Sequence, residues 1–469
     1  MDARADGWTR ARGMSSAARD AFERIMDPVT RDASGMERFA ELASASGRGG
    51  RATCGTLTDA LARGRTTLID VRSPGEYARG HVPGAVNAPL FDDADRAAVG
   101  TVYKKVGRGE ALLLGMRCAA PRFEDIVRVA AEACAKRDAE ASGSKDEDSD
   151  VVYVMCFRGG MRSTCVGWLL QERLEGKRVR VLDGGYKGFR KWALERCGPF
   201  GNVPAPRVCI IGGRTGVGKT RALLALQARG EQIIDLEGLA NHAGSAFGWV
   251  GRAEQPTSEH YSNLVACAWH ALNPNKWVFV EDEGPHVGRC SVDPLLFERM
   301  RNAPLVLRMV ATREVRLKTL VQDYATSELR ADPNWLPTMR ESVEKLGKRL
   351  GGDRVAAIQA ELEAGDFSAV AEGLLEYYDG LYDKHLMNKR KERKNATKGT
   401  SAVVGSPPID DDASSLTSRT SDRTEDEARV GAVVDVECVA DESGALDNDA
   451  MARDILAAVE SHERPDPYR

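Results

Sequence analysis

A phosphate-binding loop constrains the fold of this chain more than any other stretch of its sequence. Residues 213–220 match the pattern G-x-x-x-x-G-K-[ST], follow a predicted strand at 207–211 and lead into a helical stretch. In that context the backbone N–H groups of a glycine-rich turn cradle a diphosphate at the start of a helix. The predicted phosphate-binding residues are Gly213, Gly216, Gly218, Lys219 and Thr220. We expect Lys219 to neutralise the phosphates and the Thr220 hydroxyl to hold Mg²⁺. The motif therefore predicts an α/β domain of the P-loop NTPase type with a parallel sheet.

Acidic residues at a second strand end complete this predicted phosphate site. An apolar strand leads into Glu281 and Asp282, and a carboxylate in such a place holds the water shell of the metal in P-loop enzymes. The sequence does not decide which residue of 281–283 serves, and a solvated acidic turn is the plainer alternative. Arg313 and Arg316 share a helical face and are expected to reach either an anion or solvent. The motif does not specify ATP, because such a loop recognises a diphosphate of any kind.

Length, charge and cysteine spacing limit the classes of protein. A chain of 469 residues with 42% hydrophobic and 29% charged residues suggests two or three globular domains. The formal net charge of −4 gives no global basic field, so any RNA contact must use a local patch. None of the 10 cysteines forms a CxxC pair, which argues against a zinc site and a disulfide framework. The sequence has no apolar run of about 18 residues and no signal-peptide core. We therefore expect no membrane partner and an intracellular, most simply cytoplasmic, protein, with an organellar address left open.

Changes in composition divide the chain into four predicted segments. They are an N-terminal extension at 1–54, disordered or targeting; a first α/β domain at 55–200; the P-loop domain at 201–387; and a basic run with a low-complexity tail at 388–469. The polar residues 138–150 predict a surface insertion, and glycine and proline at 201–206 predict a domain joint. The tail from residue 399 is rich in Ser, Thr, Asp and Gly and is predicted to be largely disordered, apart from one short helix at 452–460.

A cysteine at the end of another buried strand is the predicted nucleophile. Cys156 follows the apolar run 151–155 and precedes two glycines, two arginines and a helix that begins near residue 162. A turn of this kind directs backbone N–H groups inward, and the helix adds the positive end of its dipole. Both features favour a thiolate, which is the nucleophilic form. The alternative is an inert cysteine buried at a strand end. The predicted catalytic residues are Cys156, Arg158 and Arg162, with Gly159 and Gly160 as phosphate-binding residues.

The segments around this cysteine resemble the rhodanese family over about residues 55–195. The resemblance rests on residues 69–77, 80–87 and 183–186 together with the cysteine loop. It implies a rhodanese-like parallel-sheet domain, in which the cysteine carries sulfur as a persulfide. Selenium can follow the same route.

The cysteine loop is longer than the rhodanese pattern. Five residues separate Cys156 from Arg162, one more than in rhodaneses. This is the loop length of the related cysteine phosphatases, and it suits a tetrahedral group such as selenophosphate. Phosphatase chemistry therefore stays an alternative for this domain, while Asp70, Arg72 and His81 are predicted mainly to hold the fold.

Three further stretches resemble the tRNA 2-selenouridine synthases, and this likeness covers about residues 55–386. The stretches are 99–108, 235–248 and 348–352. The resemblance implies that 2-thiouridine at the tRNA wobble position becomes 2-selenouridine. It further implies S-geranylation from geranyl diphosphate, followed by replacement of the geranylthio group using selenophosphate. The P-loop would then hold the prenyl diphosphate and the cysteine loop the selenophosphate.

The resemblance also suggests further site residues and leaves other functions open. The candidate metal-binding or site-lining residues are Asp235, Glu281, Asp282 and His242. The candidate contacts to tRNA phosphates are Lys104, Lys105, Arg108, Lys348 and Arg349, each of which has a solvated side chain as its plainer alternative. A fused sulfurtransferase and P-loop kinase acting on a small molecule is the alternative enzyme. The non-enzymatic alternative is a module that binds phosphorylated partners without catalysis. The sequence specifies neither the prenyl chain length, nor the set of tRNAs, nor an oligomeric state.

Overall fold

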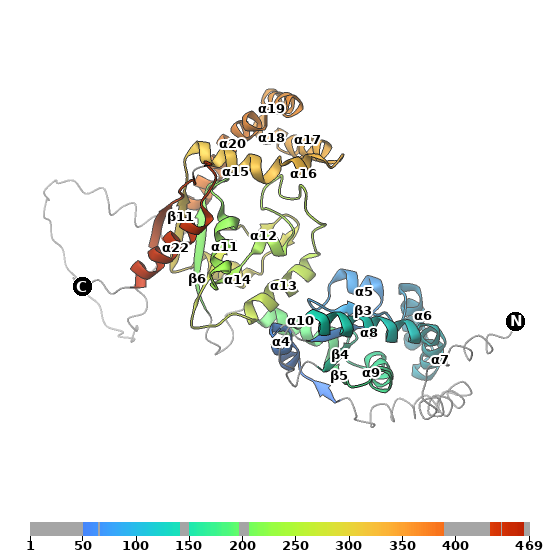
Figure 1. Ribbon diagram of the computed structural model, residues 1–469. Helices are drawn as coiled ribbons and strands as arrows, with labels where there is room; N and C mark the ends of the chain where they lie inside the picture. Colours follow the sequence, from blue (N-terminus) through green and yellow to red (C-terminus); the bar gives the residue numbers. More distant parts are fainter. Residues whose placement is uncertain are drawn as a thin grey trace, which may run out of the picture. The chain divides into compact units, whose positions relative to one another are not determined.

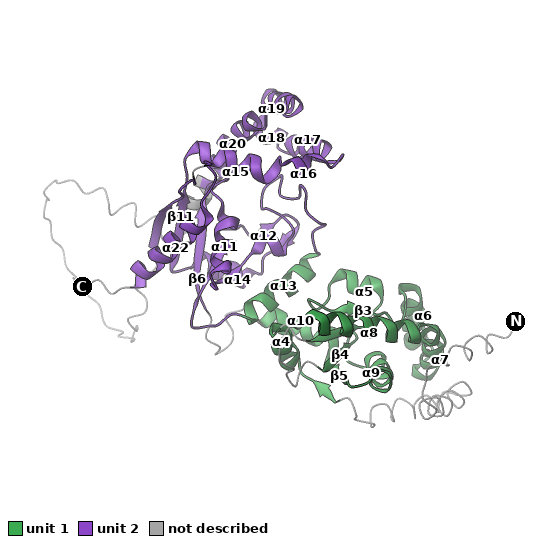
Figure 2. Cartoon of the chain, in the orientation of Figure 1, with its two compact units in different colours: residues 1–198, 257–271 green, residues 199–256, 272–469 purple. Residues whose placement is uncertain are grey.

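The computed structural model describes residues 50–63, 66–140, 150–196, 206–388, 432–441 and 443–463. The chain forms two compact units (Figure 1, Figure 2). Unit 1 contains residues 1–198 and 257–271, and unit 2 contains residues 199–256 and 272–469. Four predicted features fall wholly or partly outside the described residues: the N-terminal extension up to 49, the insertion at 141–149, the joint at 201–205 and the segment 389–431 with its basic run.

Unit 1 is built on a five-stranded parallel sheet with the strand order β1-β5-β4-β2-β3. The strands are β1 (Arg51–Ala52), β2 (Thr67–Asp70), β3 (Val86–Asn87), β4 (Val151–Met155) and β5 (Arg178–Leu182). Strands β2 and β4 are buried over their whole lengths. Short, nearly continuous apolar runs of this kind are typical of parallel strands covered on both faces.

Helices cover this sheet and set the position of the cysteine loop. They are α4 (Cys54–Ala62), α5 (Pro74–Arg79), α6 (Asp93–Lys105), α7 (Arg108–Ala119), η2 (Ala120–Arg122), α8 (Phe123–Glu140), α9 (Met161–Arg173), α10 (Gly185–Arg196) and α13 (Ser258–His270). Val166 and Leu170, one helical turn apart on α9, meet Val152 and Val154 of β4 in the main core of the unit. This contact fixes α9 directly after the strand that carries the cysteine.

Helix α13 belongs to unit 1 although it lies far downstream in the sequence, inside the range predicted for the P-loop domain. It packs on α10 and α4. The chain therefore leaves unit 2 after residue 256, contributes one helix to unit 1 and returns to unit 2 at residue 272.

Unit 2 is built on a second five-stranded parallel sheet, with the order β12-β11-β6-β8-β7. Its strands are β6 (Arg207–Gly213), β7 (Gln232–Ile234), β8 (Trp277–Glu281), β11 (Leu305–Val310) and β12 (Ala432–Glu437), and a small antiparallel pair is formed by β9 (His286–Val287) and β10 (Cys290–Ser291). The predicted architecture of two α/β domains with parallel sheets is confirmed.

The helices of unit 2 form two groups. Those near the sheet are α11 (Lys219–Ala228), α12 (Leu236–Leu239), α14 (Pro294–Arg301) and α22 (Asn448–Glu463). The others are α15 (Arg313–Tyr324), α16 (Ser327–Arg330), α17 (Trp335–Lys345), α18 (Gly347–Leu350), α19 (Gly352–Ala364) and α20 (Phe367–Asn388), which lie together in Figure 1. This second group has an apolar core of its own, which includes Trp335, Val343 and Ile358. Within the described part of the chain, no helix combines the length and apolar character needed to cross a membrane.

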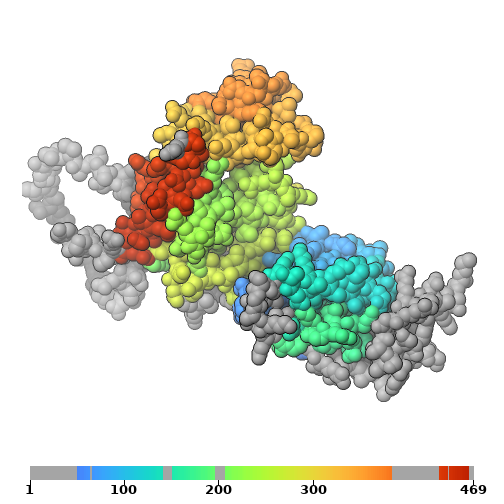
Figure 3. All heavy atoms as spheres, in the orientation of Figure 1, coloured from blue at the N-terminus to red at the C-terminus, as the bar shows by residue number. Residues whose placement is uncertain are grey.

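The prediction that the tail from residue 399 is disordered is wrong for residues 432–463. Strand β12 pairs with β11 along all of its residues, and α22 packs on α11. In Figure 3 the red C-terminal residues lie directly against the green residues of this unit. Val436, Met451 and Ile455 supply apolar side chains that are buried in the core of unit 2. The physical reason is that a low overall apolar content does not exclude one short strand and one amphipathic helix. The short helix predicted at 452–460 is confirmed as part of α22.

Candidate functional sites in the two units

The cysteine loop of unit 1 holds its thiol in a buried, polar position. Cys156 follows β4 directly, and Gly160 precedes the first turn of α9. The Cys156 side chain is buried, with Sγ 3.2 Å from Oγ of Ser163 and 3.9 Å from the carbonyl oxygen of Gly160. Ser163 is itself fully buried and donates a hydrogen bond of 3.0 Å to the Gly160 carbonyl. The sulfur therefore lies at a helix N-terminus, where a negative charge is favoured.

The turn that begins α10 clamps the cysteine loop from the other side. The backbone N–H of Tyr186 donates to the Cys156 carbonyl at 2.9 Å, and the N–H of Lys187 donates to the Phe157 carbonyl at 2.9 Å. Gly185 has a φ of +55°, and a Cβ atom there would lie 2.2 Å from the Cys156 carbonyl oxygen. Only glycine fits such a close approach of two backbones. The turn at 183–186 that supported the rhodanese resemblance is thus part of the cysteine site.

The two predicted catalytic arginines have different surroundings. Arg162 forms a half-buried ion pair of 2.9 Å with Glu76. Burial alone would raise the pKa of Glu76, but the hydrogen bond and the charge of Arg162 outweigh it and lower that pKa. Arg158 is exposed and lies over the ring of Phe157, with 5.9 Å from its guanidinium carbon to the ring centroid. Arg162 is therefore held in the loop, while Arg158 faces solvent.

Asp70, Arg72 and His81 lie in positions that support a role in holding the fold. Arg72 is 1% exposed, pairs with Asp70 at 2.7 Å and lies 3.8 Å from the ring centroid of Tyr186. His81 is stacked between Tyr77 and His260, with both ring centroids 3.8 Å away. These contacts join the segment that follows β2 to α10 and α13.

Helix α13 reaches the cysteine loop through Tyr186. The Tyr186 hydroxyl lies 2.5 Å from Oε1 of Glu259 and accepts a hydrogen bond of 3.0 Å from the Asn263 amide. The Asn263 amide also donates to the His81 carbonyl at 2.8 Å. Burial, and next the hydrogen bond that the phenol donates to Glu259, raise the pKa of the Tyr186 phenol. This buried network supports the residue whose N–H binds the Cys156 carbonyl.

The P-loop of unit 2 has the expected strand–loop–helix geometry. Strand β6 ends at Gly213 and α11 begins at Lys219. The three predicted glycines, Gly213, Gly216 and Gly218, all have positive φ angles. The Lys219 ammonium donates to the Gly213 carbonyl at 3.2 Å, so it folds back over its own loop.

Two carboxylates meet the hydroxyl at the start of α11. Oγ1 of Thr220 lies 2.7 Å from Oε1 of Glu281 and 3.2 Å from Oε2 of Glu237. Among the acidic residues 281–283, Glu281 is the one bonded to Thr220, whereas Asp282 lies 3.7 Å from the Arg301 guanidinium. Burial, and next the charge of Glu237, raise the pKa of Glu281 to about 8. The carboxylates therefore repel one another in a place where a cation would relieve the repulsion.

This oxygen cluster fits Mg²⁺. Magnesium is usually held by one or two carboxylates together with substrate phosphates and water, rather than by a cage of protein ligands. Glu281 is fully buried, and its second carboxylate oxygen has no hydrogen-bond partner among the described residues. The described residues contain no cluster of three or more His, Cys, Asp or Glu side chains that could hold a metal by itself.

The remaining site-lining candidates lie near this cluster but differ in their contacts. Asp235 caps α12, because its Oδ1 accepts a hydrogen bond of 2.6 Å from the Gly238 N–H. His242 is buried, and burial followed by the charge of Arg252 lowers its pKa, which favours the neutral ring. A Cβ atom added to Gly244 would lie 2.6 Å from Oε1 of Glu237, so the loop after α12 closes tightly over the carboxylates.

Arg316 supports the P-loop rather than facing solvent. It is buried, donates from Nε to the Thr215 carbonyl at 2.8 Å and pairs with Asp379 of α20 at 3.0 Å. Arg313 forms an exposed ion pair with Glu372. The two arginines therefore have separate partners, although the sequence placed them on one helical face.

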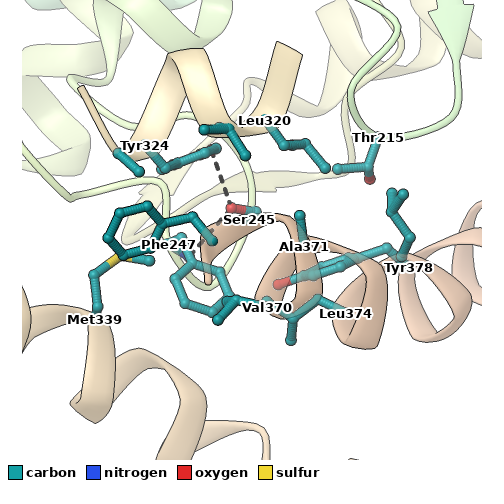
Figure 4. A pocket seen from close by; sticks show the side chains of 14 residues that line it. Thr215, Ser245, Phe247, Leu320, Tyr324, Met339, Val370, Ala371, Leu374 and Tyr378 are labelled. Carbon is teal, nitrogen blue, oxygen red and sulfur yellow. Dashed lines mark hydrogen bonds between the residues drawn. The ribbon is translucent and has the colours of Figure 1, made fainter. Parts of the chain in front are cut away.

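An apolar cavity of about 60 Å³ borders the P-loop (Figure 4). Its wall includes Thr215 of the P-loop together with Phe247, Leu320, Tyr324, Met339 and Leu374. The tyrosine hydroxyls that reach this wall are engaged with protein groups. Tyr324 lies 3.5 Å from the Ser245 hydroxyl, and Tyr378 accepts from the Ala246 N–H at 3.3 Å. The cavity therefore presents mainly hydrocarbon to a ligand.

The candidate tRNA contacts are exposed in both units. Lys104, Lys105 and Arg108 are exposed at the end of α6 and the start of α7. Arg108 also reaches the cysteine loop, since its Nη2 lies 3.9 Å from Sδ of Met161. Lys348 and Arg349 are exposed on α18 of unit 2.

No role at these sites was predicted for Ser163 or Glu237, and Arg316 was expected to reach an anion or solvent rather than the Thr215 carbonyl of the P-loop. Ser163 stands directly after Arg162, in the first turn of α9, so the sequence placed it close to the cysteine loop. Its contact with the sulfur could not be predicted from that position. Glu237 lies within the stretch 235–248 that supported the family resemblance. Its approach to Thr220 depends on the tertiary fold and has no local signal.

Fold and sites together define a class of protein, in which a rhodanese-type domain with a lengthened cysteine loop is joined to a P-loop domain. Comparison with protein families agrees. Residues 53–191 match the rhodanese-like domain, and residues 206–406 match the domain described as the tRNA 2-selenouridine synthase AAA domain.

Similar whole proteins carry the same description. The tRNA 2-selenouridine synthase of Psychromonas ingrahamii is 31% identical over 69% of this chain and 89% of its own length. The proteins of that name from Hydrogenovibrio crunogenus and Sulfurovum sp. are 34% and 35% identical, over 69% and 68% of this chain and 90% and 88% of their own lengths. The chain belongs to the tRNA 2-selenouridine synthase family, as the sequence motifs indicated.

One solved structure is similar over a shorter range. The N-terminal domain of an ATP/GTP binding protein from Clostridium difficile 630 is 33% identical over 31% of this chain and 99% of that chain, with a TM-score of 0.26.

Proposed function

We propose that this tRNA 2-selenouridine synthase divides its reaction between its two sites. Unit 2 transfers a geranyl group from geranyl diphosphate to the sulfur of wobble 2-thiouridine. Unit 1 uses selenophosphate to replace the geranylthio group with selenium. The proposal is supported by two chemically different anion sites, one in each unit. The first carries a thiol beside a helix N-terminus, and the second carries a lysine, a hydroxyl and carboxylates.

In the P-loop site the protein acts by electrostatics. The uridine sulfur attacks C1 of the prenyl chain, the C–O bond breaks and diphosphate departs, while the uridine N3 proton passes to solvent. The backbone N–H groups of the loop and the Lys219 ammonium bind the departing charge. Thr220, Glu281 and Glu237 would hold Mg²⁺, which supplies further neutralisation of the diphosphate when it is bound.

The observation that carries the choice of a prenyl donor over ATP is the apolar cavity at Thr215. A nucleotide needs polar groups that read a base, whereas a prenyl diphosphate needs a hydrocarbon wall next to a phosphate site. The volume of about 60 Å³ is small for a ten-carbon chain. We therefore expect Phe247 and Met339, which come from separate elements, to move when the whole chain enters.

In the cysteine site Cys156 is the group that reacts with the selenium donor. The N-terminus of α9 and the glycine turn bind the anion, and Arg162 adds a positive charge that Glu76 holds in place. The basic residues of α6 and α7, with Arg108 near the cysteine loop, are proposed to bind tRNA phosphates. A tRNA substrate also implies an intracellular enzyme.

Two variants separate the half-reactions. Lys219→Ala should weaken diphosphate binding and slow geranyl transfer, while Cys156→Ser should stop selenium delivery because a serine hydroxyl is a much weaker nucleophile than a cysteine sulfur. With both donors present, Cys156→Ser should accumulate S-geranylated tRNA, measured by mass spectrometry of the nucleosides. A normal rate of geranylation by Lys219→Ala would show that the prenyl donor does not bind at the P-loop. Transfer of a phosphoryl group from ATP to a small-molecule acceptor would instead support the sulfurtransferase–kinase alternative.

The cavity is tested by a charge on its wall. Leu374→Asp should raise the KM for geranyl diphosphate at least about tenfold, because a carboxylate in an apolar wall repels the chain and must be desolvated. Pyrophosphate binding should stay within a factor of about two. Leu381→Asp, an exposed position on the same helix, is the matched control. An equal effect of both variants would show that the chain binds elsewhere.

A further inference from the structure

The contact between Cys156 and Ser163 bears on how selenium leaves its donor. The two side chains are 3.2 Å apart and both are buried, at the end of a loop with five residues between Cys156 and Arg162. A loop of this length surrounds a tetrahedral phosphate group with backbone N–H donors better than a shorter one does. The shape of the site therefore favours contact between sulfur and the phosphorus end of selenophosphate.

We infer that Cys156 attacks the phosphorus of selenophosphate, not its selenium, and that Ser163 is a catalytic residue for the breakdown of the resulting phosphocysteine. This inference rests on the proposed function of unit 1. In the first step the Sγ–P bond forms and the P–Se bond breaks, with its electron pair leaving on selenium as hydrogen selenide. The proton of the hydrogen selenide anion comes from the protonated donor or from solvent, so the protein does not supply it.

The later steps also balance. Hydrogen selenide attacks C2 of the geranylated uridine and geranylthiol departs, while N3 regains its proton from solvent. Water attacks the phosphocysteine, phosphate departs and the Cys156 thiolate returns. Phosphorus stays phosphorus(V) throughout, and selenium keeps its oxidation state.

The alternative attack on selenium does not balance with the same reactants. It would put selenium on Cys156 as a perselenide and leave the electron pair on phosphorus, which would depart as phosphite. Phosphate would then form only with an added oxidant. A neighbouring thiol that could resolve a perselenide is also unsuited to do so. Burial, and next the charge of Cys156, raise the pKa of Cys165 to about 12, so it stays protonated.

The Ser163 hydroxyl is placed to serve the hydrolysis step. It contacts both the sulfur and the Gly160 carbonyl, at 3.2 Å and 3.0 Å, but has only one proton to donate. When Cys156 is a thiol, the Ser163 hydroxyl can donate its hydrogen bond to the Gly160 carbonyl. When sulfur departs from phosphorus as a thiolate, the hydroxyl can turn its proton toward that charge, and a hydrogen bond to a charged group is a strong one.

The test follows phosphorus and selenium on the full chain. The protein is mixed with selenophosphate that carries radioactive phosphorus, quenched rapidly, and examined for label on Cys156. We expect phosphorus label on the wild type and none on Cys156→Ser. Ser163→Ala should retain label at least about tenfold longer, since it loses the hydrogen bond to the departing thiolate. Ser163→Thr should restore turnover. Thr164→Ala is the matched control, because Thr164 bonds the same Gly160 carbonyl whereas the hydroxyl beside the sulfur is that of Ser163.

The outcomes separate this inference from the proposed function. Phosphorus label on Cys156 with release of phosphate supports the inference, and its persistence in Ser163→Ala also shows that the loop is folded. Selenium on Cys156 without phosphorus, or release of phosphite, overturns it. So does selenouridine formation when neither the wild type nor Ser163→Ala carries phosphorus. In those last cases the division of labour between the units still stands. Within this experiment, the division of labour fails if selenouridine forms without Cys156.

Discussion

Truncating one side chain on the C-terminal helix should destabilise unit 2. Ile455 on α22 is fully buried and lies in the same apolar core as Leu226 of α11, the helix that begins with the P-loop lysine. Strand β12, just upstream, extends the sheet beside β11. If α22 is part of the folded unit, Ile455→Ala must leave a cavity beneath the P-loop helix.

The expected size of the effect follows from the carbon atoms removed. Isoleucine loses three carbons, worth roughly 2.4 kcal/mol at about 0.8 kcal/mol for each buried CH₂. The cavity that remains adds to this, so we expect a loss of about 3 kcal/mol, within the usual range of about 2–5 kcal/mol for such truncations. A domain is typically stable by about 5–15 kcal/mol, so the change is large but leaves a folded unit.

Urea unfolding of the full chain measures this loss. Two units give more than one transition, and the transition of unit 2 is identified as the one that pyrophosphate with Mg²⁺ shifts to higher urea. With a slope of about 2 kcal/mol per molar urea, its midpoint should fall by about 1.5 M. Asp454→Ala changes the adjacent, exposed residue and should cost less than about 0.5 kcal/mol. Equal midpoints for Ile455→Ala and Asp454→Ala would refute the placement of α22 in the core.

Three further predictions concern the supports of the two sites. Gly185→Ala should lower the rate of the selenium step at least about tenfold, because its Cβ would meet the Cys156 carbonyl at 2.2 Å, and unchanged selenouridine formation would contradict this. Arg316→Ala removes the hydrogen bond to the Thr215 carbonyl and should weaken pyrophosphate binding by about tenfold in calorimetry, whereas an unchanged Kd would show that the loop is rigid without it. Burial, and next a neighbouring histidine, lower the pKa of His260 to about 4, so the unfolded chain takes up this proton first, at about pH 6.5. The stability of unit 1 should therefore fall as the pH drops from about 6.5 to 4. His260→Gln should flatten that part of the thermal unfolding profile, and a profile that coincides with the wild type would contradict the assignment.

Local patterns were enough to predict both parallel sheets and the two glycine-containing turns that follow β4 and β6. The runs 151–155 and 208–211 are apolar and precede glycine-containing turns, so β4 and β6 follow from the sequence alone. The turn after β4 begins with Cys156, and the turn after β6 leads to Lys219 at the start of α11. Recognition of the family also rested on such local stretches, and the relatives confirm it.

The features that the sequence did not predict depend on contacts between distant residues. Strand β12 has only six residues and gains its stability from pairing with β11, which no local pattern reveals. Helix α13 is amphipathic like many others, and its membership of unit 1 depends on partners such as Tyr186, some seventy positions away. In the same way Glu237 was placed near the P-loop by folding, since its neighbour Thr220 precedes it by 17 residues.

We propose that prenyl transfer precedes selenium transfer and that each step occurs at its own site. The most direct measurement is mass spectrometry of nucleosides from thiolated tRNA incubated with the wild-type protein and each donor in turn. Geranyl diphosphate alone should give only S-geranylated 2-thiouridine, selenophosphate alone should leave 2-thiouridine unchanged, and both together should give 2-selenouridine. Formation of 2-selenouridine from selenophosphate alone, at the rate seen with both donors, would contradict the account.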